Sequence, residues 1–149
     1  MAQGPSLIPG LFYEDPDAAV EWLAKAFGFE LRMSYTDDRG RIAYAEVELG
    51  AGIVAVRPQR GHSPHDLSPR TAGGVNTGHL QVAVPDVDAH CARAEQAGAR
   101  VLEPLADKFY GLRTYTAEDC DGHRWSFESA LDRPAPRDER WKRNEGRGA

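Results

Sequence analysis

The feature that most constrains this fold is an internal repeat. The tetrapeptide Asp15–Ala18 (DPDA) returns as Asp86–Ala89 (DVDA), 71 positions later, and each copy follows a short apolar run. Aspartate is a favoured helix N-cap and proline suits the first helical turn, so both copies predict the start of a helix. Gly28 and Gly98, 70 positions apart, are suited to end those helices. The chain is therefore predicted to contain two copies of one module.

Apolar residues change their spacing after each predicted helix, from the helical period to the alternation that is typical of strands. Strands are predicted at residues 7–13, 30–36, 41–49 and 53–57 in the first copy, and at 79–84, 100–102, 113–118 and 124–129 in the second. Each copy thus has the order strand, helix, three strands (βαβββ). Because one copy alone would leave an apolar sheet face exposed, the two copies should associate. The predicted fold class is α+β, with two paired βαβββ modules at about residues 7–57 and 78–129.

The modules are predicted to form one domain, residues 1–130, with a linker between them at residues 58–77. The linker is rich in Pro, Gly, Ser and His and is longer than most connections, which is typical of functional or mobile loops. His62 and His65 lie in it, either as an incidental pair or at the edge of a binding pocket.

A charged tail is predicted to follow the domain at residues 131–149. It carries six basic and four acidic side chains, together with one aromatic residue, Trp141. Two alternatives stay open for Trp141: it docks on the body or a partner, or it stays free.

The charge of the chain bears on the partners that it can have. The net charge is −5 at pH 7, and the acidic excess lies in the body rather than in the tail, so a nucleic-acid partner is not expected. Cationic or amphoteric small molecules suit such a body better. No apolar run approaches the ~20 residues of a membrane span, and the N-terminus lacks the pattern of a secretory signal. With only two cysteines, no disulfide framework is expected, and the expected compartment is the cytoplasm.

Several motifs in the second copy resemble those of a known superfamily. Gly78–Val84 (GHLQVAV) opens this copy, and Glu118–His123 (EDCDGH) precedes its last strand. With the two βαβββ patterns over residues 7–129, they resemble the vicinal oxygen chelate superfamily, the glyoxalase and bleomycin-resistance fold. Tyr110–Arg113 (YGLR) and Lys25–Gly28 (KAFG) are most similar to its PhnB-like branch. The resemblance implies a curved mixed sheet around a cavity, a small-molecule ligand and a homodimer.

The resemblance also implies where a metal would be held, because enzymes of the superfamily bind one through residues on the first and last strands of each half. Carried onto this chain, the four ligand positions are Ile8, Val56, His79 and Ser126. Only His79 is a good ligand, whereas a catalytic site needs about three from the protein. No cofactor is therefore expected. The alternative is an atypical divalent metal held by His79 and Glu128.

Strand alternation predicts the residues that line the cavity once His79 is taken to face inward. The 71-residue spacing then makes Arg113 and Tyr115 the counterparts of Ile42 and Tyr44. The predicted ligand-binding residues are Phe12, Tyr44, Glu46, His79, Gln81, Tyr110, Arg113 and Tyr115. Aromatic faces stack on flat rings or hold cations, and a guanidinium can grip a carboxylate or an enolate, so this lining favours a planar, polar ligand.

Two hypotheses for the function follow. In the first, the protein lacks an intact metal site and sequesters or recognises a planar polar, partly cationic compound, as bleomycin-resistance proteins do. In the second, it is a lyase or isomerase acting next to a carbonyl. That enzyme would use an atypical metal, or His79 and Glu46 as acid and base with Arg113 holding the enolate. Each of these three residues also has a structural interpretation, as a hydrogen-bonded histidine, a solvated carboxylate and an arginine paired with Glu46.

Overall fold

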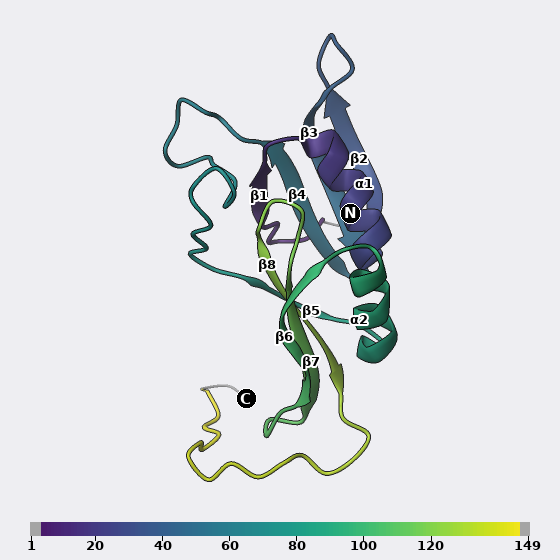
Figure 1. The fold of residues 1–149 in the computed structure, drawn as a ribbon, viewed down its shortest axis with the longest axis vertical. Helices are drawn as coiled ribbons and strands as arrows, with labels where there is room; N and C mark the ends of the chain where they lie inside the picture. Colours follow the sequence, from purple (N-terminus) through teal and green to yellow (C-terminus); the bar gives the residue numbers. More distant parts are fainter. Residues whose placement is uncertain (1–3, 147–149) are drawn as a thin grey trace.

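Two helices begin where the repeated aspartates predict them (Figure 1). The computed structural model describes residues 4–146 and places α1 at Pro16–Phe27 and α2 at Val87–Gln96. Asp15 and Asp86 cap them, each accepting a hydrogen bond from the backbone N–H three residues on, at 3.2 and 3.1 Å. Gly28 ends α1 with a φ of 80°, a left-handed conformation that favours glycine. Both predicted N-caps and the Gly28 C-cap are therefore confirmed, whereas the C-cap of α2 is Ala97, one residue before Gly98.

Eight strands complete the two modules. They are β1 (Gly10–Tyr13), β2 (Glu30–Thr36), β3 (Ile42–Leu49), β4 (Gly52–Pro58), β5 (Leu80–Ala83), β6 (Arg100–Asp107), β7 (Leu112–Glu118) and β8 (Arg124–Ala130). Hydrogen bonds organise them as two four-stranded sheets, in the orders β1-β4-β3-β2 and β5-β8-β7-β6. β1 is parallel to β4 and β5 to β8, whereas the other neighbours are antiparallel. The predicted α+β class and the paired βαβββ modules are confirmed.

One strand is longer than predicted. β6 runs over Arg100–Asp107 and not only over residues 100–102. Its pairing with β7 shifts register between Glu103 and Ala106, around Pro104. Proline is tolerated there because β6 is an edge strand with an irregular ladder, where a missing N–H donor costs little.

The two modules share one hydrophobic core. Phe27, at the end of α1, packs on Trp125 and Phe127 of β8, with ring centroids 5.7 and 4.7 Å apart. Figure 1 shows the two sheets arranged along the long axis of the molecule, with α1 and α2 adjacent to each other. The core therefore lies where the helices meet the apolar faces of both sheets.

Polar contacts also join the modules. His90 of α2 bonds the Tyr115 hydroxyl through Nδ1 at 2.6 Å and the Phe27 carbonyl through Nε2 at 2.8 Å. Burial lowers the pKa of His90, so the neutral imidazole is favoured. Arg93 donates to two carbonyls in the last turn of α1, at 2.8 and 3.0 Å. The second helix thus satisfies the C-terminal carbonyls of the first.

The tail contacts the body. Residues 131–146 form no helix or strand, but Arg133 pairs with Asp107 at 2.8 Å, and the Trp141 ring lies parallel to that of Phe109 with centroids 5.9 Å apart. Of the two alternatives for Trp141, the described residues favour docking on the loop between β6 and β7. The predicted domain and tail extend to residues 1–3 and 147–149, which lie outside the described residues. No helix within residues 4–146 is long and apolar enough to cross a membrane.

Candidate functional site

Each sheet packs one face on the helices and leaves the other face uncovered by them; we call the second the open face. On β3, Ala45 and Val47 lie in the core, whereas Tyr44 and Glu46 alternate with them and face the other way. On β8, Trp125 and Phe127 belong to the core, so Ser126 faces the other way. Gln81 pairs with Ser126 on the open face of the second sheet. The predicted orientations are therefore correct for β3, β5 and β8.

An aromatic and charged cluster lies on the open face of the first sheet. Tyr44 lies opposite Tyr35 of β2, with ring centroids 6.4 Å apart, and the Tyr44 hydroxyl donates to Glu46 Oε1 at 3.1 Å. The Arg57 guanidinium of β4 lies over the Tyr44 ring, 4.8 Å from its centroid. Arg32 Nη1 is 2.5 Å from Glu46 Oε2. Partial burial and the nearby Glu46 carboxylate raise the pKa of Tyr44, so its hydroxyl stays a donor.

Three members of this cluster, Tyr35, Arg57 and Arg32, were not predicted from the sequence. The Tyr35 side chain is 66% exposed and lies opposite Tyr44 across the β2–β3 hairpin. Counting outward from the turn at Asp37–Gly40 would have placed Tyr35 opposite Ile42, and a register shift between Tyr35 and Thr36 brings it opposite Tyr44 instead. Arg57 lies opposite Phe12 of β1, a residue predicted correctly to share this face. The cluster therefore joins side chains from all four strands of the first sheet.

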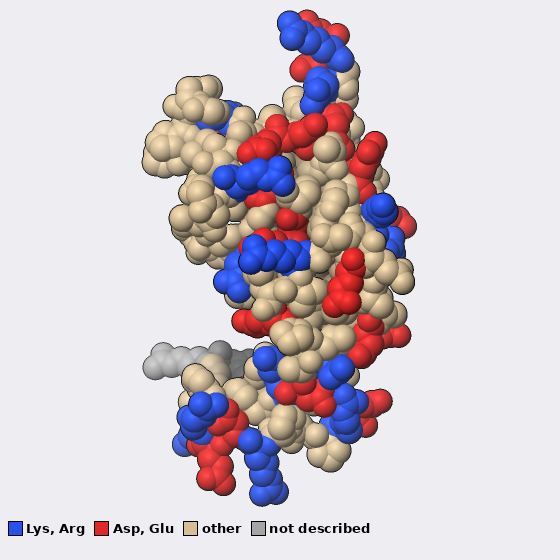
Figure 2. Space-filling model, in the orientation of Figure 1, with Lys and Arg blue, Asp and Glu red and all other residues tan. Residues whose placement is uncertain are grey.

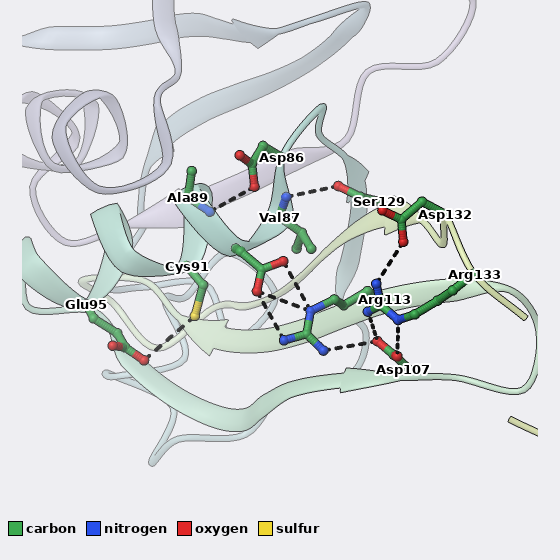
Figure 3. A network of polar contacts seen from close by, with 11 residues as sticks. Asp86, Val87, Ala89, Cys91, Glu95, Asp107, Arg113, Ser129, Asp132 and Arg133 are labelled. Atoms are coloured by element: carbon green, nitrogen blue, oxygen red, sulfur yellow. Dashed lines mark hydrogen bonds and ion pairs between the residues drawn. The ribbon is translucent and has the colours of Figure 1, made fainter. Parts of the chain in front are cut away.

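The predicted inward orientation is wrong for Arg113 (Figure 3) and for Tyr115. Arg113 lies between helix and sheet, where its guanidinium pairs with Asp88 of α2 at 3.1 Å and with Asp107 of β6 at 3.0 Å. These two carboxylates raise the pKa of Arg113, and hydrogen bonds from Arg133 and Arg113 lower that of Asp107. Tyr115 is fully buried in the core and stacks on Phe127. Neither residue reaches the open face.

A one-residue change in the repeat spacing explains this error. Ala45 of β3 and Tyr115 of β7, both in the core, are 70 positions apart, so the third strand of each module follows the spacing of Gly28 and Gly98. The prediction used 71, the spacing of the helix caps. Because side chains alternate, a shift of one residue moves a whole strand to the opposite face.

The predicted metal positions do not fit a metal. Val56 lies in the core, and Ala55 takes its place on the open face, beside Glu46. Neither side chain offers a lone pair. Glu128 lies opposite Ala83 of β5, and Ala83 is four residues beyond His79, which is about 13 Å at the usual strand rise. The structure therefore does not bring His79 and Glu128 together. Within residues 4–146, no group of three or more His, Cys, Asp or Glu side chains is placed to hold a metal ion.

The three candidate catalytic residues, His79, Glu46 and Arg113, do not share one site in the structure. His79 lines a cavity that does not include Glu46 or Arg113. Glu46 is engaged by Arg32 and Tyr44, and Arg113 by Asp88 and Asp107. An acid, a base and an enolate-binding group are therefore not assembled from these residues.

The cavity that includes His79 lies where β1, the linker and the start of β8 meet. It holds about 390 Å³, and its wall includes Phe12, His65, Asn76 and Arg124. Tyr110 lines a different hollow, of about 920 Å³, between Phe109 and the tail. Within the chain it therefore lies apart from the cavity that includes His79. Figure 2 shows acidic and basic side chains interspersed along the visible face, whereas the linker is largely uncharged.

The comparisons with known proteins agree with this architecture. Residues 8–127 match the Glyoxalase/Bleomycin resistance protein/Dioxygenase superfamily. An uncharacterised protein of Mycobacterium bovis is 31% identical over 126 residues, covering 83% of this chain and 82% of that protein. An uncharacterised protein of Mycobacterium tuberculosis has the same identity, over 83% and 73% of the two chains.

Two solved structures are also similar to this chain. TioX from Micromonospora sp. ML1 is 38% identical and superposes with a TM-score of 0.67, covering 86% of this chain and all of that one. The fosfomycin resistance protein FosX of Listeria monocytogenes, solved with Mn(II) and a dihydroxypropylphosphonic acid, is 15% identical. Its TM-score is 0.60 over 89% of this chain and 94% of that one, which shows a shared fold. The PhnB-like branch stays a prediction. The match over residues 8–127 shows that the chain belongs to the glyoxalase/bleomycin resistance protein/dioxygenase superfamily.

Proposed function

We propose that this protein binds a planar, polar and partly cationic small molecule on the open face of its first sheet, without a resident catalytic metal. The observation that carries the proposal is the pair of stacked partners on that face, the Tyr44 ring and the Arg57 guanidinium. A guanidinium is itself planar and cationic, so Arg57 stands where a flat cationic ring of a ligand would lie. Tyr35 adds a second exposed aromatic surface beside it.

Acidic groups at the same place support the cationic part of the proposal. Glu48 is half-exposed and lies 4.0 Å from the Arg32 guanidinium, whereas Glu46 is nearly buried and engaged more closely by the same arginine. Both carboxylates are on β3 and share the open face with Tyr44. Glu46 is two residues and Glu48 four residues further along the strand. A bound cation would therefore meet an aromatic face and carboxylates together, with Glu48 the more available of the two.

Titration calorimetry with acridinium, a planar tricyclic cation, tests the proposal. We expect saturable binding to the wild type, and about tenfold weaker binding to Tyr44→Ala, because a cation–π contact contributes about 0.5–2 kcal/mol. Cyclohexylammonium, a non-planar cation, should bind more weakly than acridinium. Phe109→Ala is the matched control, since Phe109 is a partly exposed ring beside the tail, and it should leave the affinity unchanged.

Equal affinity of the wild type and Tyr44→Ala for acridinium would contradict the placement of the site. The metal-free part of the proposal has its own test in the same titration. Treatment with EDTA, followed by Zn²⁺, Ni²⁺ or Mn²⁺, should leave the acridinium affinity unchanged. A bound metal near one per chain, required for binding, would show that the ligand positions were misread.

We also propose that two copies of the chain associate. Within residues 4–146, β1 and β5 each pair with one neighbour, which leaves one edge of each of these two strands unpaired there. Apolar side chains are exposed near these edges and on β2, with Leu7 78% and Leu31 51% exposed. A second copy would cover edges and faces that are costly to leave in water.

Sedimentation equilibrium checks the association. The chain has a mass of 16.4 kDa, and we expect twice this mass at micromolar concentration. A single species of 16.4 kDa across the whole concentration range would contradict the proposed homodimer.

A further inference from the structure

The cavity between β1, the linker and β8 contains an arginine without a counter-ion. Arg124 is in no ion pair within 4.0 Å among residues 4–146, and its side chain makes no hydrogen bond there. Its Nε is shielded from solvent and has no hydrogen-bond partner. A buried donor without a partner is costly, so a structure retains one rarely and with a reason.

The nearest acidic neighbour in the sheet does not satisfy Arg124. Glu118 lies directly opposite it on β7, yet the Glu118 carboxylate is paired with Arg100 at 3.7 Å. The backbone around Arg124 is fixed independently of its guanidinium, because its N–H donates to Asn76 Oδ1 at 3.2 Å. Asn76 in turn donates to the Gly122 carbonyl at 2.8 Å. The guanidinium is therefore held at the cavity wall without a structural partner.

The rest of the cavity wall favours negative charge. Three imidazoles, of His65, His79 and His123, line it together with Arg124, and no carboxylate is among the lining residues. The His123 imidazole is engaged through Nε2 with the Phe12 carbonyl at 2.7 Å. The His65 and His79 rings make no hydrogen bond within the described part of the chain. In a protein with a net charge of −5, a cavity lined by three imidazoles, one guanidinium and no carboxylate is distinctive.

We propose that this cavity binds the oxyanion group of a small molecule, a carboxylate or a phosphate, with Arg124 as the principal contact. The planar fork of a guanidinium matches both groups, and the ring N–H groups of His65 and His79 supply further donors at the rim. The site is separate from the proposed aromatic site, with which it shares only Phe12 at its wall. A result that contradicts one of the two proposals therefore does not contradict the other.

Nuclear magnetic resonance of the full-length, ¹⁵N-labelled protein tests the site with two probes, inorganic phosphate and benzoate, at constant ionic strength. Because the Arg124 Nε atom is shielded from solvent, its N–H should give an observable resonance that shifts saturably with the bound probe. Arg124→Met keeps the aliphatic stem and should weaken binding at least about tenfold. Arg39→Gln, in the exposed β2–β3 turn, is the control and should change the affinity less than about twofold. The probe that binds more tightly identifies the group.

Thermal unfolding of the same variants separates a binding role from a structural one. If Arg124 is retained for a ligand, Arg124→Met should leave the unfolding midpoint unchanged or raise it, since the orphaned donor is removed. A lowered midpoint or a failure to fold would overturn the proposal, because Arg124 would then be structural. Absence of saturable binding of both probes, or equal losses in Arg124→Met and Arg39→Gln, would overturn it too.

Discussion

Phe27→Ala is expected to lower the free energy of unfolding by about 3–5 kcal/mol, the usual cost of removing a buried phenylalanine ring. Phe27 is fully buried, and its ring contacts both modules: Trp22 of its own helix and Trp125 and Phe127 of β8. Those neighbours belong to two elements in different modules, α1 and β8, so they cannot close the cavity left by the ring without moving one module relative to the other. Denaturation by urea, followed by circular dichroism, measures the change.

Phe109→Ala removes the same ring from a different environment. Phe109 is 38% exposed and its stacking partner Trp141 is 62% exposed, so we expect a loss of about 1 kcal/mol or less. The difference in unfolding free energy between the two variants therefore reports the packing of the shared core and not merely the loss of an aromatic ring. If Phe27→Ala cost no more than Phe109→Ala, the two modules would not depend on one another through α1.

Local signals in the sequence predicted most of the fold. The caps at Asp15 and Asp86 and the glycine after α1 act within a few residues, so they could be recognised without tertiary information. Most strands were recognised by alternation, because one face of each sheet packs on helices and the other does not. β6 was predicted too short, since Pro104 interrupts its pattern at an irregular edge.

The candidate site was predicted in part, and the reason lies in the repeat. The two copies differ by one residue between the helix cap and the third strand, so a spacing measured at the caps gave the wrong orientation for Arg113 and Tyr115. Tyr44 and Glu46 were placed correctly because their orientation came from their own strand. A side-chain orientation inferred from the alternation within its own strand is therefore more reliable than one inferred from the spacing between the two copies.

The cavity around Arg124 could not have been predicted from local pattern. Its wall joins β1, the linker and β8, which are more than a hundred positions apart at the extremes, and Asn76 holds the linker in place through the Gly122 carbonyl. An arginine at the start of a strand is unremarkable in sequence. Only the tertiary structure shows that Glu118, its cross-strand neighbour, is paired with Arg100.

Asp119→Ala is expected to destabilise the protein by at least about 3 kcal/mol, because this buried carboxylate accepts hydrogen bonds from both modules. Its Oδ2 accepts from the Tyr13 hydroxyl at 2.6 Å and from Trp125 Nε1 at 3.0 Å. Its Oδ1 accepts two backbone N–H groups in the turn that precedes β8. Burial raises the pKa of Asp119, whereas the nearby His123 and the hydrogen bonds from Tyr13 and Trp125 lower it, so these partners favour the charged carboxylate against its burial. Asp121→Ala, which removes an acceptor from the Glu14 N–H alone, should cost about 1 kcal/mol.

A double-mutant cycle between Asp119 and Tyr13 tests this account more sharply than the single variants. In the wild type, Tyr13→Phe removes a hydroxyl that donates to a carboxylate and should cost about 1–3 kcal/mol. In Asp119→Ala the same hydroxyl is a buried donor without its acceptor, so Tyr13→Phe should then be neutral or stabilising. The coupling has this sign only if the bond between the modules is made in the folded state. Equal effects of Tyr13→Phe in both backgrounds, measured by urea denaturation, would show that Asp119 stabilises its own turn alone.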